Sequence, residues 1–388
     1  MFTINPIQRG GEFKLHIGFD AHSIGAGLGG NETYASNLIE ALAEVDTQNR
    51  YTLYVTKQEA VDRYTHRWNN ISVKKTLPHT PLIRIPLVLA AELRRRPVDI
   101  LHVQYTAPPL APCDTVVMIH DLSFEHLPET FKRRSWMQMR LTVRRTARAA
   151  AHVVTDSEYS RQDILRTYRL PPERVTTTPL AASSRFEPSN DKRVLDKYGI
   201  EGDYILAVGS IQPRKNIARL IRAYTLMLLQ HPDNAPKLVI VGKRAWLFEE
   251  TIKAAAVSSA SEKIVFTGYV PESDLAALYT GALCFAYPSF FEGFGIPLLE
   301  AMRCGTPTIT SDRTCFPEVV GDASLIIDPF DEQSIADGLW RMISDAALRE
   351  QLRTRGFAQS SLFDWQQTAR LTLNVYEQVF NRRRTRAS

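Results

Sequence analysis

Cysteine is scarce in this chain, and so are the patterns that would give it a structural role. The 388 residues include 4 cysteines, and none of them forms a CxxC pair or stands in a zinc-binding spacing with histidines. The pattern argues against a disulfide framework or a zinc module. It indicates buried thiols in a reducing compartment.

Long hydrophobic runs are missing as well. The N-terminal stretch has no cationic segment followed by an apolar one, which argues against a secretory signal peptide. The longest uncharged stretch, Leu275–Phe291, contains threonine, glycine, proline and serine and does not suit a membrane-spanning helix. We therefore expect a cytoplasmic protein without a spanning segment.

An excess of one charge and a high aromatic content are also absent. Lys and Arg number 47 against 42 Asp and Glu, and aromatic residues make up 9% of the chain. Without basic segments interleaved with aromatic residues, nucleic-acid binding is not expected. The hydrophobic content of 44% is typical of a globular protein, and the length suits two domains.

Short apolar runs alternate with helix-period segments along almost the whole chain. This alternation predicts parallel sheets covered by helices on both faces, since strands such as LVIVG are apolar on successive residues. The expected strands are Leu15–Asp20, Tyr51–Val55, Ile100–Gln104, Thr115–His120, Val153–Thr155, Val175–Thr178, Tyr204–Gly209, Lys237–Gly242, Ile264–Gly268, Leu283–Tyr287, Thr308–Ser311 and Ser324–Ile327. The expected helices include Asn31–Val45, Leu82–Arg95, Arg133–Ala150, Glu158–Tyr168 and Trp365–Phe380. The fold class is α/β, with two Rossmann-like, doubly wound parallel-sheet domains facing a central cleft.

The polar, proline-containing stretch Pro179–Lys197 separates two series of strands and helices. We therefore expect an N-terminal domain over residues 1–185 and a C-terminal domain over residues 186–364. A final helical segment over residues 365–388 is expected to fray at its arginine-rich end.

A glycine-rich segment, Gly25–Gly30, lies between the first expected strand and the first expected helix. Glycines let a backbone approach a phosphate closely, and free N–H groups at a helix start attract an anion. The spacing also satisfies the GxGxxG pattern of nicotinamide-binding domains, but no acid closes the second expected strand. A phosphate-binding loop is favoured, and a nicotinamide site and a structural turn are the alternatives.

Two adjacent cations, Arg214 and Lys215, follow the strand expected at Tyr204–Gly209. Open parallel sheets bind ligands at the carboxyl ends of their strands, and paired cations there can neutralise a diphosphate. A solvent-exposed charge pair is the alternative for these two residues taken alone.

The segment Phe291–Glu300 carries two glutamates around a Gly-Phe-Gly sequence. Its glycines argue against one unbroken helix, and Pro297 suits an early helical position. Glu292 is then expected on a loop before the helix and Glu300 one turn inside it, with the amides of Phe294–Ile296 at the helix N-terminus. The alternative is a capping carboxylate and an exposed helical glutamate, which leaves the Gly-Phe-Gly sequence unexplained.

His120 and Asp121 follow another expected strand, again at the carboxyl edge of a sheet. A hydrogen-bonded structural histidine and a catalytic histidine are both consistent with this pair.

The stretch Arg133–Arg148 contains no acid and gathers arginines. As a helix it places Trp136, Met139, Val143 and Ala147 on one face and Arg133, Arg140, Arg144 and Arg148 along an adjacent stripe. A basic amphipathic helix of this kind suits the surface of an anionic membrane. A half-buried helix with a solvated face is the alternative.

Several short words of the sequence carry a more specific signal. They are Gly29-Gly-Asn-Glu32, His120-Asp-Leu-Ser123, Thr155-Asp-Ser-Glu-Tyr-Ser160, Pro213-Arg-Lys-Asn216, Thr267-Gly-Tyr-Val270 and Pro288–Met302, which holds a Glu-x7-Glu pattern. With them nearly the whole chain resembles the retaining GT-B glycosyltransferases of family 4. That family includes phosphatidylinositol mannosyltransferases, bacterial O-antigen mannosyltransferases and sucrose phosphate synthases.

The resemblance implies a role for each matching residue. The donor-binding residues would be Gly29, Gly30, Arg214, Lys215, Tyr269, Val270, Glu292, Phe294, Gly295, Ile296 and Glu300. The catalytic residues would be His120, Glu292, Arg214 and Lys215. Within this set, Arg214 and Lys215 would hold the diphosphate, and Glu300 would bind the ribose hydroxyls. Glu292 with the Phe294–Ile296 amides would grip the donor sugar, His120 would contact that sugar, and Tyr269 and Val270 would border the nucleobase. The helix expected over residues 365–388 would be the family's C-terminal segment that crosses back to the N-terminal domain.

The resemblance further implies a reaction without metal or cofactor, in which the donor phosphate accepts the proton of the acceptor hydroxyl and the anomeric configuration is retained. GDP-mannose is the favoured donor, and a glycan or lipid-linked sugar is the expected acceptor, reached at the inner face of the cytoplasmic membrane. One departure is Ser210, where many relatives carry an arginine. Arg214 would supply the missing charge.

Other functions share parts of this pattern. A glycoside hydrolase could use the paired glutamates, an epimerase could hydrolyse its sugar nucleotide, and a binding protein could hold a sugar nucleotide without catalysis. A hydrolase needs neither the Arg-Lys pair nor the glycine-rich loop. Analysis of the reaction products would separate all of these.

Overall fold

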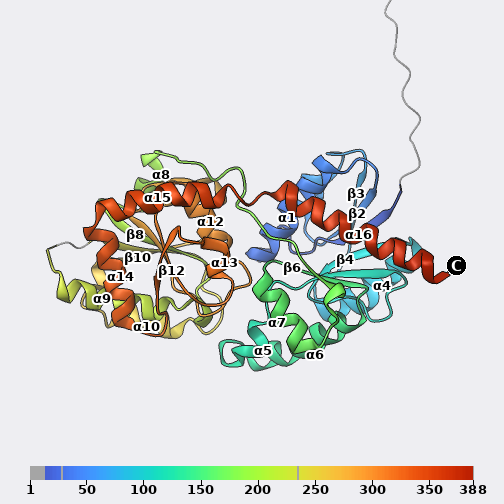
Figure 1. The fold of residues 1–388 in the computed structure, drawn as a ribbon, viewed down its shortest axis with the longest axis horizontal. Coiled ribbons are helices and arrows are strands. Elements are labelled where there is room, and N and C mark those ends of the chain that lie inside the picture. Colours follow the sequence, from blue (N-terminus) through green and yellow to red (C-terminus); the bar gives the residue numbers. More distant parts are fainter. Residues whose placement is uncertain (1–13, 28, 234–235, 388) are drawn as a thin grey trace, which may run out of the picture. The chain divides into compact units, whose positions relative to one another are not determined.

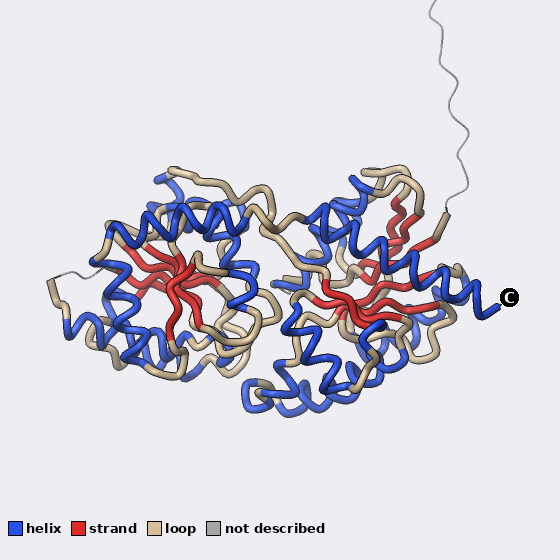
Figure 2. The backbone as a smooth tube through the Cα atoms, in the orientation of Figure 1, coloured by secondary structure: helices blue, strands red, loops and turns tan. Residues whose placement is uncertain are grey.

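The structure, a computed structural model, describes residues 14–27, 29–233 and 236–387. The described chain forms two parallel sheets, each with helices on both faces (Figures 1 and 2). Two compact units are distinguished: the first comprises residues 1–116 and 376–388, and the second residues 117–375. The predicted α/β class with two parallel sheets is confirmed. The domain limits expected from the sequence, and the cleft between the domains, stay predictions, and residues 1–13 of the first domain lie outside the described residues.

The first sheet has seven strands in the order β3-β2-β1-β4-β5-β6-β7. Their bounds are β1 His16–Asp20, β2 Arg50–Val55, β3 Ile71–Lys75, β4 Ile100–Gln104, β5 Asp114–Met118, β6 His152–Thr155 and β7 Val175–Thr177. Ile17 of β1 pairs with Tyr51 on one side and Ile100 on the other. The strand order therefore reverses between β1 and β4. The sequence did not predict β3, whose residues ISVKK are half-exposed and end in two lysines.

The second sheet has six strands in the order β10-β9-β8-β11-β12-β13. Their bounds are β8 Tyr204–Val208, β9 Lys237–Val241, β10 Ile264–Gly268, β11 Cys284–Tyr287, β12 Thr308–Ser311 and β13 Ser324–Ile327. Here the order reverses between β8 and β11. In open parallel sheets, such a reversal opens a crevice at the carboxyl ends of the strands where ligands bind.

Helices cover both sheets (Figure 1). Those before residue 180 are α1 Gly30–Val45, α2 Gln58–Tyr64, α3 Pro81–Ile83, α4 Ala90–Arg95, α5 Ser123–His126, α6 Arg133–Ala149 and α7 Glu158–Tyr168. The later ones are α8 Lys192–Lys197, α9 Ile217–Gln230, α10 Glu249–Ala256, α11 Glu272–Thr280, α12 Ile296–Arg303, α13 Phe316–Val320, α14 Glu332–Ser344, α15 Ala346–Ser360 and α16 Trp365–Ala387. The single helix expected over residues 82–95 is corrected: α3 and α4 flank a π-helical segment, Arg84–Leu89.

The start of α9 shows how packing in the second unit positions a functional turn. Leu220, Tyr224 and Met227 recur at helical spacing and are fully buried in the core against the second sheet. Asn216, in the left-handed conformation at φ 58°, begins the helix, and its side-chain amide donates to the carbonyls of Pro288 and Pro329 at 3.1 and 2.7 Å. The turn immediately before α9 is therefore fixed at the edge of the sheet.

The last helix, α16, contacts residues far from it in the sequence. The Thr368 hydroxyl donates to the Pro179 carbonyl in the second unit. In the first unit, the Tyr376 hydroxyl is hydrogen-bonded to Nδ1 of His102 at 2.8 Å, and Lys14 pairs with Glu377 at 2.6 Å. The helix also runs through the arginine-rich end that the sequence led us to expect as a frayed tail.

Candidate active site

The strand reversal of the second sheet gathers three charged side chains. After β8, the 3-10 turn Pro213–Lys215 carries Arg214 and Lys215. After β11, the loop before α12 carries Glu292 to the same place, and the Phe290 N–H donates to the Arg214 carbonyl at 3.0 Å. The topology thus brings together residues that the sequence separates widely.

Glu292 is bound by both cations at once. Arg214 Nη1 donates to Oε2 of Glu292 and Lys215 Nζ donates to Oε1, each at 2.7 Å. The Lys215 ammonium also donates to the Tyr287 hydroxyl and lies 4.7 Å from the centroid of that ring. Asp121 adds a second carboxylate, 3.9 Å from Arg214. The predicted grouping of Arg214, Lys215 and Glu292 is thus present in the structure, although this does not test their roles.

These contacts set the ionisation of the cluster. Burial would raise the pKa of Glu292, but Arg214 and Lys215 outweigh it and lower that pKa to about 2. Burial lowers the pKa of Lys215, against the opposing effect of Glu292. Burial would also lower the pKa of Arg214, but Glu292 and Asp121 outweigh it and raise that pKa well above the usual range. Glu292 is therefore a carboxylate throughout the neutral range and has no proton to donate.

The N-terminus of α12 lies beside this cluster. Gly295 precedes the helix with φ 97°, a conformation that favours glycine, and Pro297 stands in the first turn as predicted. Within the described chain, the N–H groups of Phe294, Gly295 and Ile296 donate to no other group. Free amides at a helix start attract an anion. Across the described residues no group of three or more histidine, cysteine or acidic side chains is placed to hold a metal ion.

Two residues that the sequence analysis did not single out hold the loop of Glu292. The Thr314 hydroxyl accepts from the Glu292 N–H at 3.3 Å. The buried Cys315 thiol contacts the carbonyls of Glu292 and Phe294 at 3.3 and 3.2 Å. They follow β12, so the topology of the sheet explains their place, but no local signal in the sequence does.

Glu300 lies one turn inside α12, as expected, and is buried. Its Oε2 accepts a hydrogen bond from the Tyr279 hydroxyl at 2.9 Å. Burial raises the pKa of Glu300 to about 8, because among the described residues no cation lies close enough to oppose it. Glu300 and Glu292 are thus two buried carboxyls with opposite ionisation.

His120 is held by Asp156 on the loop after β6. Its Nδ1 donates to Asp156 Oδ2 at 2.8 Å, and Asp156 raises the pKa of His120 despite the burial that would lower it. A Cβ on Gly293 would lie 2.1 Å from the His120 carbonyl oxygen, so only glycine fits there. The Ser160 hydroxyl donates to the carbonyls of His120 and Gly293 at 3.1 and 3.4 Å. The structure therefore places His120 directly against the loop of Glu292.

The glycine-rich loop belongs to the first unit. The N–H groups of Gly25 and Gly27 donate to the Glu32 carboxylate at 2.7 and 2.8 Å, so these two amides are not open to a ligand. Gly29 has φ 57°, and a Cβ added to Gly29 or Gly30 would meet open space. The two glycines assigned to donor binding are thus the accessible ones.

Tyr269 and Val270 follow β10 in the second unit. Tyr269 is 62% exposed and carries the Lys243 ammonium 4.3 Å from its ring centroid, whereas Val270 is buried. The loops after β8, β9 and β10 are joined by hydrogen bonds, including Gly242 N–H to the Gly268 carbonyl at 2.8 Å. Tyr269 therefore lies at the same sheet edge as Lys215, although it does not contact the charged cluster.

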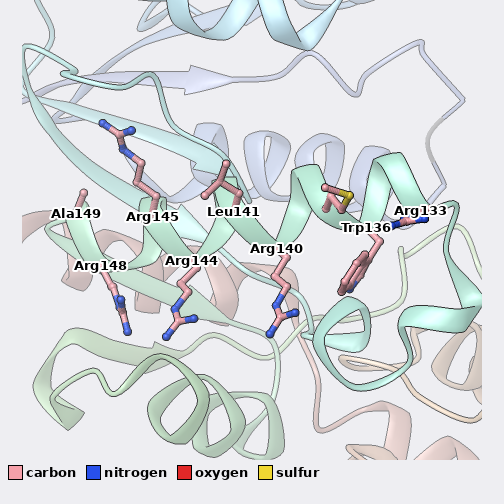
Figure 3. Close-up of a pocket in the computed structure, with 9 residues that line it drawn as sticks. Arg133, Trp136, Arg140, Leu141, Arg144, Arg145, Arg148 and Ala149 are labelled. Carbon is pink, nitrogen blue, oxygen red and sulfur yellow. The ribbon is translucent and has the colours of Figure 1, made fainter.

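The helix α6 presents an open groove of about 960 Å³ along its exposed side (Figure 3). Its lining residues are Arg133, Trp136, Met137, Arg140, Leu141, Arg144, Arg145, Arg148 and Ala149. Met137 and Leu141 are 56% and 72% exposed, whereas Val143 and Ala147 are buried on the opposite face. The helix is thus amphipathic as predicted. In the part of the chain that is described, no helix is both long and apolar enough to cross a membrane.

Two protein families match the chain. Residues 28–182 match the family described as Glycosyltransferase Family 4, and residues 192–359 match Glycosyl transferases group 1. Together these matches contain Gly29 and Gly30, the Arg214–Lys215 turn, Glu292 and Glu300.

Two individual glycosyltransferases are similar to this chain in sequence. The chain is 37% identical over 268 residues to the O-antigen chain mannosyltransferase B of Escherichia coli, an alignment that covers 68% of this chain and 70% of that protein. It is 31% identical over 229 residues to the serotype-specific mannosyltransferase WbdA of Escherichia coli, covering 58% of this chain but 28% of WbdA.

Solved structures support the fold. Sucrose-phosphate synthase from Thermosynechococcus elongatus superposes with a TM-score of 0.74 over 95% of this chain and 100% of that one, at 19% identity. At that identity the likeness shows the fold alone, which is the two-sheet GT-B fold. The chain therefore belongs to the group 1 glycosyltransferases of family 4, a family of retaining hexosyltransferases.

Proposed function

We propose that this glycosyltransferase transfers mannose from GDP-mannose to a glycan or a lipid-linked sugar, with retention and without a metal ion. The single observation that carries the proposal is the buried cluster of Arg214, Lys215 and Glu292 at the strand reversal of the second sheet. Mannose is favoured because relatives that cover much of the chain are named mannosyltransferases.

In this proposal the cations and the α12 amides bind the donor diphosphate. The bond between the anomeric carbon and the phosphate oxygen breaks, and the leaving diphosphate gains negative charge. Arg214, Lys215 and the amides of Phe294–Ile296 stabilise that charge, the task a divalent cation performs elsewhere. The acceptor oxygen bonds to the anomeric carbon on the same face, and its proton passes to a phosphate oxygen of the leaving group.

Glu292 orients the donor sugar rather than attacking it. With its pKa near 2 and both oxygens held by cations, its carboxylate is a weak base and a weak nucleophile. Its remaining lone pairs can accept hydroxyl hydrogens of the sugar. His120 contacts the donor sugar beside Glu292. Glu300 accepts hydrogen bonds from the ribose hydroxyls, and Tyr269 borders the nucleobase. Gly29 and Gly30 approach the phosphates.

The test combines ligand binding with product analysis. The purified protein is heated with GDP, UDP, ADP or NAD, in the presence of a chelator, and a ligand at about a hundred times its Kd should stabilise it by roughly 2.7 kcal/mol. GDP-mannose is then incubated with a mannose-terminated acceptor. Selective stabilisation by GDP and an α-linked product are expected. Free mannose as the sole product, or stabilisation by NAD alone, would overturn the proposal.

The exposed side of α6 supports a further part of the proposal, contact with an anionic membrane at its cytoplasmic face. Its exposed methionine and leucine can insert among lipid headgroups while the flanking arginines pair with lipid phosphates. Figure 3 shows Arg140, Arg144 and Arg148 directed to one side of the helix and Leu141 and Arg145 to the other. A lipid-linked acceptor would be presented at such a surface.

Liposome flotation tests this contact. The parent protein should bind vesicles containing phosphatidylglycerol and should not bind phosphatidylcholine vesicles. The double variant Arg144→Glu, Arg145→Glu should lose binding to the phosphatidylglycerol vesicles. A matched control is Arg94→Glu, Arg95→Glu, two adjacent exposed arginines on α4. Equal flotation of the two double variants would remove the assignment of α6.

A further inference from the structure

The first sheet also reverses its strand order, and a polar cluster with no role assigned above lies at the ends of strands β1, β2 and β3, on one side of that reversal. The cluster is formed by Asp20, His22, Thr56, His79 and Arg84. All five belong to the first unit. Two of them are histidines that keep part of their surface in solvent.

The base of this cluster is a buried ion pair. Arg84 Nη1 and Nη2 donate to the two carboxylate oxygens of Asp20 at 2.8 and 3.0 Å, and both side chains are almost fully buried. Burial would raise the pKa of Asp20, but His22 and Arg84 hold it well below the usual range. The guanidinium of Arg84 is therefore neutralised by Asp20 inside the protein and is not available to bind a ligand.

The hydrogen bonds above this pair fix the tautomer of both histidines. Nδ1 of His22 lies 3.2 Å from the Asp20 carboxylate, which only accepts, so Nδ1 carries the proton. The Thr56 hydroxyl donates its one hydrogen to the His22 carbonyl at 3.2 Å. It must then accept from Nδ1 of His79, 2.8 Å away.

A ring in this tautomer that carries no second proton presents Nε2 as an acceptor. Within the described chain neither Nε2 has a hydrogen-bond partner, and the ring centroids lie 6.2 Å apart. Burial lowers the pKa of His79, which favours its neutral form; the titratable and charged groups around it are His22, Lys57, Arg84 and Asp20. Two oriented rings with open Nε2 atoms match a ligand that hydrogen-bonds through neighbouring hydroxyls, which can both donate and accept.

We propose that His22 and His79 form the subsite that binds the acceptor sugar, a neutral hexopyranose whose hydroxyls hydrogen-bond to the two Nε2 atoms. The inference rests on the proposed glycosyl transfer for its biological meaning. Asp20, Arg84 and Thr56 are positioning residues, since they hold the rings and their tautomers without touching the ligand.

The first experiment needs no donor. Methyl α-mannoside is titrated into the protein while the imidazole ring signals are followed by NMR, with His22→Gln and His79→Gln used for assignment. Saturable shifts of the His22 and His79 signals, with the exposed His66 unchanged, are expected. Titration to tens of millimolar without a shift at either ring would overturn the subsite even if the protein transfers mannose.

Kinetics provides the second readout. His22→Ala and His79→Ala should raise the KM for methyl α-mannoside at least about tenfold, change kcat less than about threefold, and leave the Kd for GDP unchanged. His79→Gln, which can keep an acceptor, should recover part of the KM, and His66→Ala is the matched control. An equal loss of GDP binding, or an unchanged KM in variants that melt like the parent, would contradict the assignment. If the parent transfers no mannose, the proposed function fails, and the NMR titration still decides the subsite.

Discussion

The two strand reversals of this protein are built from opposite chemistry. At the second sheet, Arg214 and Lys215 meet at one carboxylate and the free amides of a helix start lie beside them. At the first sheet, Arg84 is paired with Asp20, and the Nε2 atoms of His22 and His79 have no hydrogen-bond partner among the described residues. The two sheets thus offer similar locations, and the side chains after the strands differ in the charge that they present there.

Removing the charges of the second reversal should have the largest effect on this contrast. Lys215→Ala and Glu292→Ala should each lower turnover at least about a hundredfold, because a preorganised charge or the sugar-orienting carboxylate is lost. The measurement is the initial rate of mannosyl transfer at saturating donor.

Arg222→Ala is the matched control, since this arginine pairs with Glu250 and Glu332 at a partly exposed site of the same unit. It should change the rate by less than about twofold. Glu292→Gln separates folding from function, because it keeps the shape of the side chain. Turnover near that of the parent in either alanine variant would remove that residue from the catalytic set.

The next largest effect is expected from two glycine substitutions, Gly293→Ala and Gly30→Ala, which should differ in their effects on stability and activity. Gly293→Ala should lower both stability and activity, the latter at least about tenfold, because the added Cβ would lie 2.1 Å from the His120 carbonyl and the loop must shift. Gly30→Ala should leave the melting temperature unchanged, since its Cβ meets open space, and should weaken donor binding only.

Thermal melting and GDP titration of both variants check this expectation. An unchanged Kd for GDP in Gly30→Ala would indicate that the glycine-rich loop is a structural turn and does not bind the donor. A parent-like rate in Gly293→Ala would mean that the loop of Glu292 tolerates displacement.

The smallest effect concerns pH and two buried carboxyls. Glu300 has a folded pKa of about 8 against an ordinary value of 4.5, so its ionisation costs stability as pH rises through that window. Asp20 is the reverse case: its folded pKa is depressed, so its contribution is present above pH 3.8 and is lost as pH falls.

In the proposed function the ribose hydroxyls bind the carboxylate form of Glu300, so GDP binding should release a proton. The Kd for GDP should fall about fourfold between pH 7.5 and 9, as a pKa of about 8 requires. Calorimetry in buffers of different ionisation enthalpy measures the proton directly, and Glu300→Gln should abolish both effects. A pH-independent Kd for GDP in the parent would show that Glu300 does not bind the ribose hydroxyls.

The sequence predicted most of this structure because its signals are local. Every strand expected from an apolar run was found, and the Gly-Phe-Gly-Ile-Pro segment predicted both the loop of Glu292 and the start of α12. The strand β3 was missed because its half-exposed residues lack an apolar run. The helix over residues 82–95 was predicted as continuous because periodicity does not reveal a π-helical segment.

Contacts between distant segments could not be predicted in this way. The sequence places Arg214 and Glu292 at strand ends, but only the strand order makes them partners. Nothing near Asp20 indicates that Arg84 will neutralise it, and nothing near Glu32 indicates that its carboxylate will occupy two glycine amides. Such pairings depend on three-dimensional packing.

The hydrogen bond between Tyr376 and His102 bears on how the chain folds during synthesis. The first unit combines residues 1–116 with residues 376–388, so the whole second unit is translated between its two parts. Domains fold as units while the chain emerges. The first unit is therefore complete only after residues 376–388 have been made, and until then the buried His102 lacks its Tyr376 partner. A chain truncated before residue 376 should therefore carry an unfinished first unit.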